Sequence, residues 1–218
     1  MDRKFQNLIK RMIDIVVSLV VLIPFFPIWT LIAILIKITS QGPIFFLQDR
    51  PGRNKRIFKV YKFRTMKPGS DTMIKGKEVM KDDDRVTTIG KFLRRSKLDE
   101  IPQVLNVLRG EMSLIGPRPE RIASLADYTD EISKRLNMNP GMTGLAQVSG
   151  NIYLSLEDRY KLDIFYVEHF SIWLDFKILI RTVGVVLFGE DKFLDKSLVE
   201  INLGSTKVAG TKEENVSQ

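Results

Sequence analysis

Two adjacent carboxylates, Asp99 and Glu100, lie in a stretch rich in cationic residues, RRSKLDEIPQ at positions 94–103. The sequence of 218 residues has no cysteine, which excludes thiolate nucleophiles and thiolate metal sites. It has one histidine, His169, to which we assign no catalytic part. Nucleophilic attack, proton transfer and metal binding therefore fall mainly on carboxylates. The Asp-Glu pair among these cations is the first candidate for such chemistry.

The Asp-Glu pair is expected at the start of a helix. Residues 100–109 place apolar side chains at helical spacing, and Gly110 is a natural C-terminal stop. Pro102 is acceptable only in a first turn, which makes Asp99 the expected N-cap. A helix N-terminus also attracts phosphate. Many helices begin with an Asp-Glu pair that has no catalytic role, but the nearby cations and the lack of other nucleophiles favour the functional interpretation here.

A second candidate stretch is GEMSLIGPRPE at positions 110–120. Arg118 stands between Pro117 and Pro119, which hold the backbone stiff and extended. Such a backbone can aim a guanidinium group at a phosphate. The alternative interpretation is a rigid turn with a solvated arginine.

The two stretches resemble the bacterial sugar transferases, the small monotopic polyprenyl-phosphate phosphoglycosyl transferases. The resemblance extends in order along roughly residues 8–188. Its further motifs are KFRTM at 62–66, RVT at 85–87, IG at 89–90, PGMTGLAQV at 140–148, Asp163, and YV at 166–167. Several motifs in the right order are far more specific than any one of them.

The resemblance implies a reaction. Asp99 is expected to attack the sugar-bearing phosphate of a UDP-sugar, release UMP and carry a covalent phosphosugar. A polyprenyl (undecaprenyl) phosphate then accepts the sugar 1-phosphate, as the first membrane step of glycoconjugate assembly. The resemblance also implies Mg²⁺ with Asp99 and Glu100 as ligands, although Glu100 has the alternative role of activating the acceptor phosphate. Lys62, Arg94 and Arg118 are the expected contacts of the substrate phosphates.

The resemblance also implies a fold. It is mainly α with a short β-hairpin, held at the cytoplasmic face of the bacterial inner membrane by a re-entrant N-terminal helix and interfacial helices. We expect the re-entrant helix at 1–40, a catalytic domain lying on the membrane at 41–190, and a flexible tail at 191–218. Three positions depart from the family pattern: Phe26, Lys97 and Asn139 replace a serine, a serine and an arginine. We therefore assign Asn139 no phosphate contact.

Residues 12–36 are almost wholly apolar, with the single charge Asp14. As a straight helix they would reach roughly 36 Å, enough to cross a bilayer. Pro24 and Pro27 each cost about 3 kcal/mol inside a regular helix, which predicts a sharp break. Basic residues flank the segment on both sides and favour the same side of the membrane for both ends. From these features alone a kinked spanning helix stays open, whereas the resemblance favours the re-entrant one.

The rest of the chain alternates short predicted elements with polar segments. Two strands at 44–47 and 57–63 surround the turn PGRN and read as a hairpin, and 67–84 reads as a loop. Further helices are expected at 85–95, 118–137, 155–167 and 170–188, the last lying in the membrane interface.

Charge is unevenly distributed. Residues 1–64 contain 12 Lys and Arg against 3 Asp and Glu, whereas the remainder contains 22 against 23. A basic excess around the apolar segment favours an anionic membrane surface or a phosphorylated ligand. The sequence contains no helix-turn-helix, zinc-finger or RNA-binding motif, which speaks against nucleic acid as a partner.

Two other functions stay open. A metal-dependent glycosyltransferase would use Asp82, Asp83 and Asp84 as its metal motif, transfer the sugar without its phosphate and release UDP instead of UMP. A non-catalytic protein that only binds anionic lipid would release no nucleotide, and the replacement Asp99→Asn would not alter its lipid binding. The ordered motifs weigh against the second of these.

Overall fold

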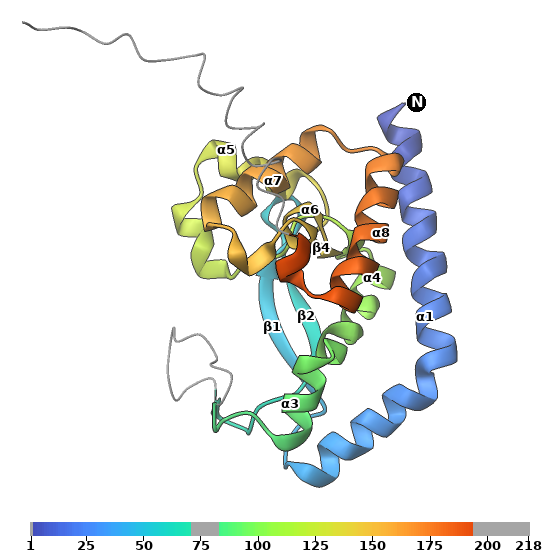
Figure 1. Ribbon diagram of the computed structural model, residues 1–218, viewed down its shortest axis with the longest axis vertical. Helices are drawn as coiled ribbons and strands as arrows, with labels where there is room; N and C mark the ends of the chain where they lie inside the picture. Colours follow the sequence, from blue (N-terminus) through green and yellow to red (C-terminus); the bar gives the residue numbers. More distant parts are fainter. Residues whose placement is uncertain (1, 71–82, 194–218) are drawn as a thin grey trace, which may run out of the picture.

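The computed structural model describes residues 2–70 and 83–193 of the chain. The described part is mainly helical with one β-hairpin, which confirms the predicted class (Figure 1). The expected tail from residue 194 onward and residues 71–82 of the expected loop lie outside the described residues. In chain order the elements, with η for 3₁₀ helices, are α1 (Arg3–Thr39), β1 (Phe45–Pro51), η1 (Arg53–Lys55), β2 (Ile57–Phe63), α3 (Thr88–Arg95), η2 (Leu98–Gln103), α4 (Val104–Arg109), β3 (Ser113–Ile115), η3 (Ile122–Asp127), α5 (Asp130–Ser133), η4 (Lys134–Asn137), β4 (Gly141–Thr143), α6 (Leu145–Val148), η5 (Asn151–Tyr153), α7 (Leu156–Glu168), α8 (Ile172–Phe188) and η6 (Glu190–Phe193).

Helix α1 is long, apolar and sharply bent. It runs over 37 residues, and its second half turns in below the rest of the molecule (Figure 1). Pro24 and Pro27 lie inside it, where each lacks an N–H and presses on the carbonyl four residues earlier. The predicted break is therefore a bend within one continuous helix. Among the described residues α1 alone is long and apolar enough to cross a membrane, judged by length and composition.

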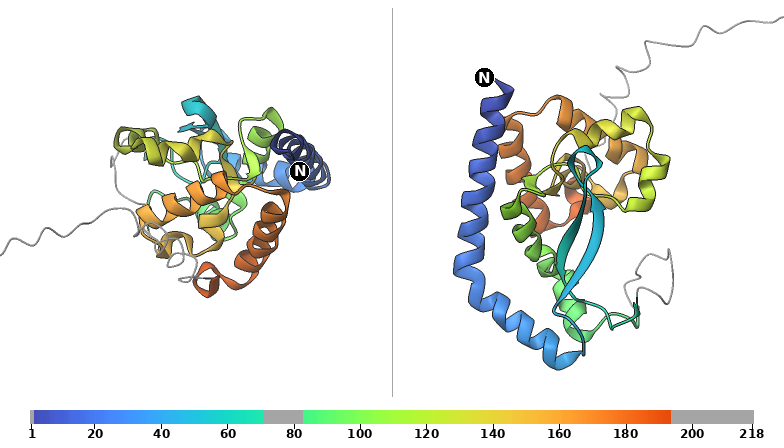
Figure 2. Two further views of the ribbon diagram at one scale, coloured as in Figure 1. Left: turned by 90° about the horizontal axis from the view of Figure 1, so that it is seen from above. Right: turned by 180° about the vertical axis from the view of Figure 1, so that it is seen from behind.

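Both ends of α1 contact the same domain, along whose outside the helix runs (Figure 2). Near the start, Arg3 donates a hydrogen bond to the carbonyl of Val167 at 2.7 Å. In the second half, Trp29 and Ile36 are buried in a core cluster, and Trp29 meets Phe63 of the hairpin edge-to-face. The outward face of α1 leaves many large apolar side chains exposed. The helix is thus apolar on both faces, as expected for one placed between protein and lipid.

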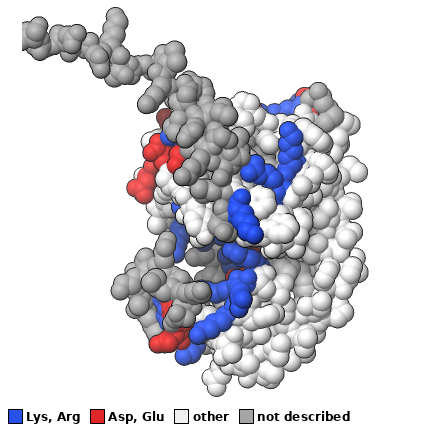
Figure 3. Space-filling view, viewed as in Figure 1, with Lys and Arg blue, Asp and Glu red and all other residues white. Residues whose placement is uncertain are grey.

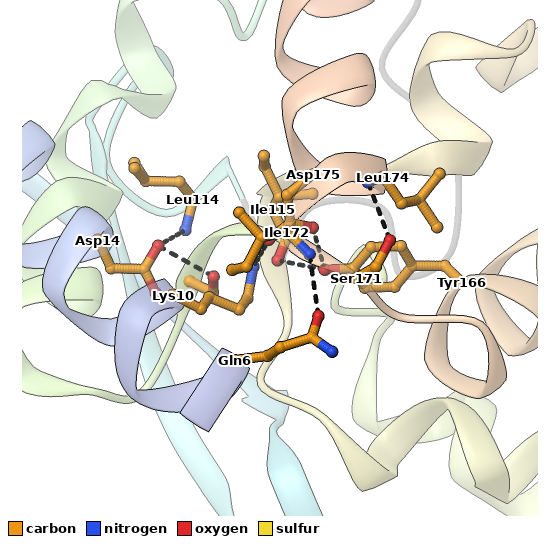
Figure 4. Close-up of polar contacts among 11 residues, drawn as sticks. Gln6, Lys10, Asp14, Leu114, Ile115, Tyr166, Ser171, Ile172, Leu174 and Asp175 are labelled. Carbon is orange, nitrogen blue, oxygen red and sulfur yellow. Dashed lines mark hydrogen bonds and ion pairs between the residues drawn. The ribbon is translucent and has the colours of Figure 1, made fainter. Parts of the chain in front are cut away.

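Three polar residues of α1, Gln6, Lys10 and Asp14, point toward the rest of the domain and find partners far along the chain (Figure 4). Lys10 forms an ion pair with Asp175 of α8 at 2.6 Å, and the hydroxyl of Tyr166 donates to the same carboxylate at 2.7 Å. Asp14, the one charge of the apolar segment, accepts a hydrogen bond from the backbone N–H of Leu114 at 2.9 Å. These buried groups are satisfied by one another, so they fix the first half of α1 to α8 and β3.

The hairpin formed by β1 and β2 is antiparallel, with Phe45 opposite Phe63 at one end and Pro51 opposite Ile57 at the other. Its predicted turn is confirmed, and β1 is longer than the predicted strand. Asn54 has a φ of 56°, a left-handed conformation that asparagine tolerates better than most residues. Strand β2 contacts η2, which brings the end of the hairpin to the Asp-Glu pair.

Strands β3 and β4 are short and parallel, and they join the 110–120 stretch to the 140–148 stretch. Gly116 donates a backbone hydrogen bond to Thr143, and Gly141 donates one to Pro117, both at 2.9 Å. A Cβ added to Gly141 would lie 2.1 Å from the backbone nitrogen of Gly116, so a side chain there would push the two stretches apart.

The predicted helix at 118–137 is wrong. The chain there forms three short pieces, η3, α5 and η4. Tyr128 and Thr129 are extended, and the Thr129 side chain accepts a hydrogen bond from the N–H of Ile132, so this threonine starts a new helix instead of continuing an old one. The helices predicted at 155–167 and 170–188 are confirmed as α7 and α8, and the one predicted at 85–95 is confirmed from residue 88 onward.

Candidate active site

The Asp-Glu pair lies in the first turn of η2 and not at the N-cap that was predicted for Asp99. Helix α3 ends at Arg95, and Lys97 then adopts a left-handed conformation with a φ of 58°. This conformation is uncommon for a residue with a long side chain. The left-handed turn starts η2 two residues before Glu100, so both carboxylates still lie at a helix start.

Glu100 is held by two cations from distant parts of the chain. Its Oε1 lies 2.6 Å from Lys62 of β2 and 3.2 Å from Arg118. Burial alone would raise the pKa of Glu100, but the charges of Arg118 and Lys62 outweigh it and lower the pKa to about 2. Glu100 is therefore held in its ionised form at neutral pH by these two cations.

The pKa of Asp99, the residue just before Glu100, is shifted in the opposite direction. Burial and the neighbouring charge of Glu100 raise its pKa, and the charges of Lys62 and Arg94 offset this only in part. Within residues 2–70 and 83–193 its carboxylate forms no ion pair. Two neighbouring carboxylates thus differ: one is clamped by cations, and the other lies near them without being bound.

Lys62, Arg94 and Arg118 come together from three separate parts of the chain, which are β2, α3 and the segment between β3 and η3. Arg94, on α3, donates from Nε to the hydroxyl of Thr65 at 2.8 Å, which fixes the start of its guanidinium group. Lys and Arg side chains gather along the middle of the face in Figure 3, between the levels of α8 and α3 in Figure 1. All three cations predicted from the sequence therefore lie close to the Asp-Glu pair, in a region suited to anionic ligands.

Arg118 is supported from behind by Arg135, a residue that the sequence did not single out. Arg135 is 2% exposed, forms a buried ion pair with Asp163 of α7, and donates to the backbone carbonyl of Arg118 at 2.8 Å. Arg50 of β1 donates to the neighbouring carbonyl of Pro119 at 3.1 Å. The stretch between the two prolines is thus fixed by hydrogen bonds as well as by its own stiffness.

A cavity of about 460 Å³ adjoins the pair and contains Glu100 and Arg118 in its wall. Its wall also includes Thr182 of α8 and Gln147 of α6. The amide nitrogen of Gln147 donates to the carbonyl of Met142 at 3.1 Å, and its buried Oε1 has no partner among the described residues. A buried acceptor without a partner is costly unless a ligand or water supplies a donor. Gln147 lies in the stretch at 140–148, but nothing in its residue type pointed to this geometry.

The described residues contain no group of three His, Cys, Asp or Glu side chains that could hold a metal ion. Mg²⁺ commonly binds through one or two carboxylates together with substrate phosphates and water. Asp99 and Glu100 match that smaller donor set. In the alternative motif, Asp82 lies outside the described residues, and Asp83 is engaged by Arg85 at 2.6 Å.

Two further residues noted in the sequence, His169 and Asn139, make contacts that do not involve the Asp-Glu pair. His169 is exposed and stacks on Phe165 with ring centroids 4.2 Å apart. Asn139 donates to the backbone carbonyl of Gly110 at 3.0 Å, away from the Asp-Glu pair.

A bent apolar helix and a carboxylate pair among cations define a membrane-associated protein with a site for anionic ligands. The chain belongs to the family described as Bacterial sugar transferase, whose sequence model matches residues 5–189. This confirms the resemblance found in the motifs.

Curated relatives agree with the family. A "UDP-glucose:undecaprenyl-phosphate glucose-1-phosphate transferase" of Caulobacter vibrioides is 38% identical over 204 residues, 88% of this chain and 75% of that protein. The "Uncharacterized sugar transferase EpsL" of Bacillus subtilis is 40% identical over 183 residues, 84% of this chain and 89% of that protein. An "Undecaprenyl-phosphate glucose phosphotransferase" of Komagataeibacter xylinus is 39% identical over 201 residues, 87% of this chain. The chain spans only 38% of this last protein, and 44% of a relative from Aeromonas hydrophila.

Proposed function

We propose that this chain transfers a sugar 1-phosphate from a UDP-sugar to a polyprenyl phosphate through a covalent intermediate on Asp99. The proposal rests on one contrast: Glu100 is clamped by two cations, whereas Asp99 forms no ion pair in the described part of the chain. A carboxylate that no cation holds in an ion pair can attack phosphorus, and the cations near it offset the repulsion between two anions. The names of the relatives support this donor and acceptor.

The reaction has two displacements at the same phosphorus atom. An oxygen of Asp99 bonds to the phosphorus that carries the sugar, and the bond from that phosphorus to the UMP oxygen breaks, so UMP leaves. A phosphate oxygen of the polyprenyl phosphate then bonds to the phosphorus, and the bond to Asp99 breaks. The carboxylate is regenerated, and the product is a polyprenyl diphosphate-sugar. Two inversions predict net retention at phosphorus and ping-pong kinetics.

The surrounding residues have distinct parts in this reaction. Lys62, Arg94 and Arg118 contact the phosphates and stabilise the charge that develops in each displacement. Gln147 offers its unpaired Oε1 to an O–H or N–H group of the donor. Asp99 and Glu100 would hold Mg²⁺, which supplies further neutralisation of the diphosphate when it is bound.

The same proposal includes a re-entrant position for α1. A helix that crossed the membrane would separate its two ends by a hydrocarbon layer of about 30 Å. Both ends of α1 instead contact the one domain that contains the Asp-Glu pair, and basic residues flank the apolar segment on both sides. A bent helix that enters and leaves on the cytoplasmic side satisfies both observations. The acceptor phosphate lies at headgroup depth, so a site at this boundary reaches it without extracting the lipid.

The test is to incubate the full chain with a panel of UDP-sugars, with and without polyprenyl phosphate. Donor alone should release about one UMP per active enzyme and add the mass of one sugar phosphate to the peptide containing Asp99. Asp99→Asn should abolish both, whereas the matched control Asp130→Asn, at an exposed position of α5, should leave both unchanged. Release of UDP, or an active enzyme that never acquires the adduct, would contradict the proposal.

A further inference from the structure

A second, larger cavity lies at the N-terminal end of α1. Its volume is about 770 Å³, and none of its lining residues is shared with the cavity beside Glu100. The first turns of α1, η1, η4 and the end of α7 form its walls. The proposed reaction uses none of these residues. Six of them are cationic: Arg3, Lys4, Lys10, Arg11, Arg53 and Lys134.

The positive charge of this cavity is only partly compensated. Its wall contains two carboxylates, those of Asp14 and Glu168, and carboxylates outside the wall pair with Lys10 and Lys134. Arg3 and Arg11 donate to backbone carbonyls, which order the guanidinium groups without neutralising them. The side chains of Lys4 and Arg53 form no hydrogen bond or ion pair in the part of the chain that the structure describes. A concave site with several uncompensated cations concentrates anions and suits a phosphate group.

The surroundings of the cavity indicate an amphiphile. On the same turns of α1 that supply the cations, Phe5, Leu8 and Met12 are 51%, 57% and 59% exposed. The helix therefore offers a cationic wall on one side and an apolar surface beside it. A free phosphate would use only the first of these, whereas a lipid would use both.

We propose that this cavity binds the phosphate of an anionic phospholipid headgroup, with the acyl chains along the outer face of α1. The bound lipid holds the N-terminal half of α1 at headgroup depth. This proposal does not depend on the reaction assigned to Asp99.

The experiment uses the delipidated full chain in neutral detergent micelles. Dimyristoyl phosphatidylglycerol or phosphatidylcholine is titrated in, and retained lipid is measured by native mass spectrometry. Wild type should retain phosphatidylglycerol preferentially, and less of it at high salt. Each cation near an anionic headgroup contributes a factor of about five, so Lys4→Gln combined with Arg53→Gln should weaken retention about 30-fold. Both side chains lack partners, so the variant should unfold at the wild-type temperature.

A matched control removes the same charge elsewhere. Lys59→Gln combined with Arg121→Gln changes two exposed cations outside the cavity and should leave retention unchanged. Equal retention of the two lipids, or equal weakening by both double variants, would overturn the proposal. Inorganic phosphate and glycerol 3-phosphate distinguish the source of the phosphate. If either bound at micromolar concentration while lipid did not, the ligand would be a soluble phosphate and the lipid assignment would fail.

Discussion

Replacing Asp163 with asparagine tests the buried ion pair that supports the Arg118 stretch. Arg135 and Asp163 are each 2% exposed, and Arg135 also donates to the Arg118 carbonyl. Asparagine keeps the volume of the side chain but removes the charge, which leaves a buried guanidinium without its direct counter-ion. Removing one partner of such a pair costs about 3–5 kcal/mol. For a chain of this length that lowers the midpoint of thermal unfolding by about 6–20 °C.

The double variant Arg135→Met with Asp163→Leu tests whether the loss of stability in Asp163→Asn comes from the unpaired charge of Arg135. Apolar replacement of both partners is often close to neutral, but here it also leaves the Arg118 carbonyl without its donor, at about 1–3 kcal/mol. The double variant should therefore unfold above Asp163→Asn alone. On the same helix, Glu157→Gln breaks only an exposed pair with Lys161 and should shift the midpoint by less than about 2 °C.

Unfolding is followed by circular dichroism of the full chain in detergent. UMP release is measured at a temperature where every variant is folded. Asp163→Asn should also slow turnover, because the guanidinium that fixes the Arg118 stretch is free to move. Two results would refute the assigned role of the pair. One is an Asp163→Asn protein that melts within about 2 °C of wild type, and the other is a double variant that melts below Asp163→Asn.

Three further predictions concern the site and the membrane. Lys62→Met removes the closer cation of Glu100 and should lower kcat/KM about 100-fold in a UMP-release assay, whereas Lys91→Met, at an exposed position of α3, should change it less than twofold. Gln147→Met removes the unpaired acceptor and should raise the KM for the UDP-sugar about 2- to 10-fold with kcat nearly constant; an unchanged KM would show that no donor group reaches it. The chain has no cysteine, so single cysteines at positions 2 and 55 can be labelled cleanly in sealed vesicles. Both should react from the same side, and labelling from opposite sides would mean that α1 spans the bilayer.

Local rules of sequence were sufficient for much of the fold. The turn at Pro51-Gly52 predicted the hairpin because its residues suit tight turns, and the apolar spacing after Ser155 predicted α7. The fold also brings Lys62, Arg94 and Arg118 from separate motifs to the Asp-Glu pair, and their contacts with substrate phosphates stay a prediction.

The features that the sequence did not predict depend on contacts between residues far apart in the chain, which patterns of neighbouring residues do not include. Lys97 takes a left-handed conformation that its residue type disfavours, so the start of η2 could not be located from propensity. Asp14 was noted only as an isolated charge, because its partner at Leu114 is 100 residues away. The partners of Arg135 were equally remote from any local pattern, with Asp163 on α7 and the Arg118 carbonyl before η3.

The burial of α1 in the core limits how this enzyme can be handled. Trp29, Ile32 and Ile36 belong to the same cluster as Phe63 of the hairpin. Each buried side chain of this size contributes roughly 1.5–3 kcal/mol, so their loss together would approach the whole stability of an ordinary domain. Trimming the apolar N-terminus should not yield a stable water-soluble fragment, because the cut exposes the core cluster that packs against Leu98 and Ile101, beside the Asp-Glu pair. Inhibitor screens and crystallisation trials need the intact chain in micelles or nanodiscs.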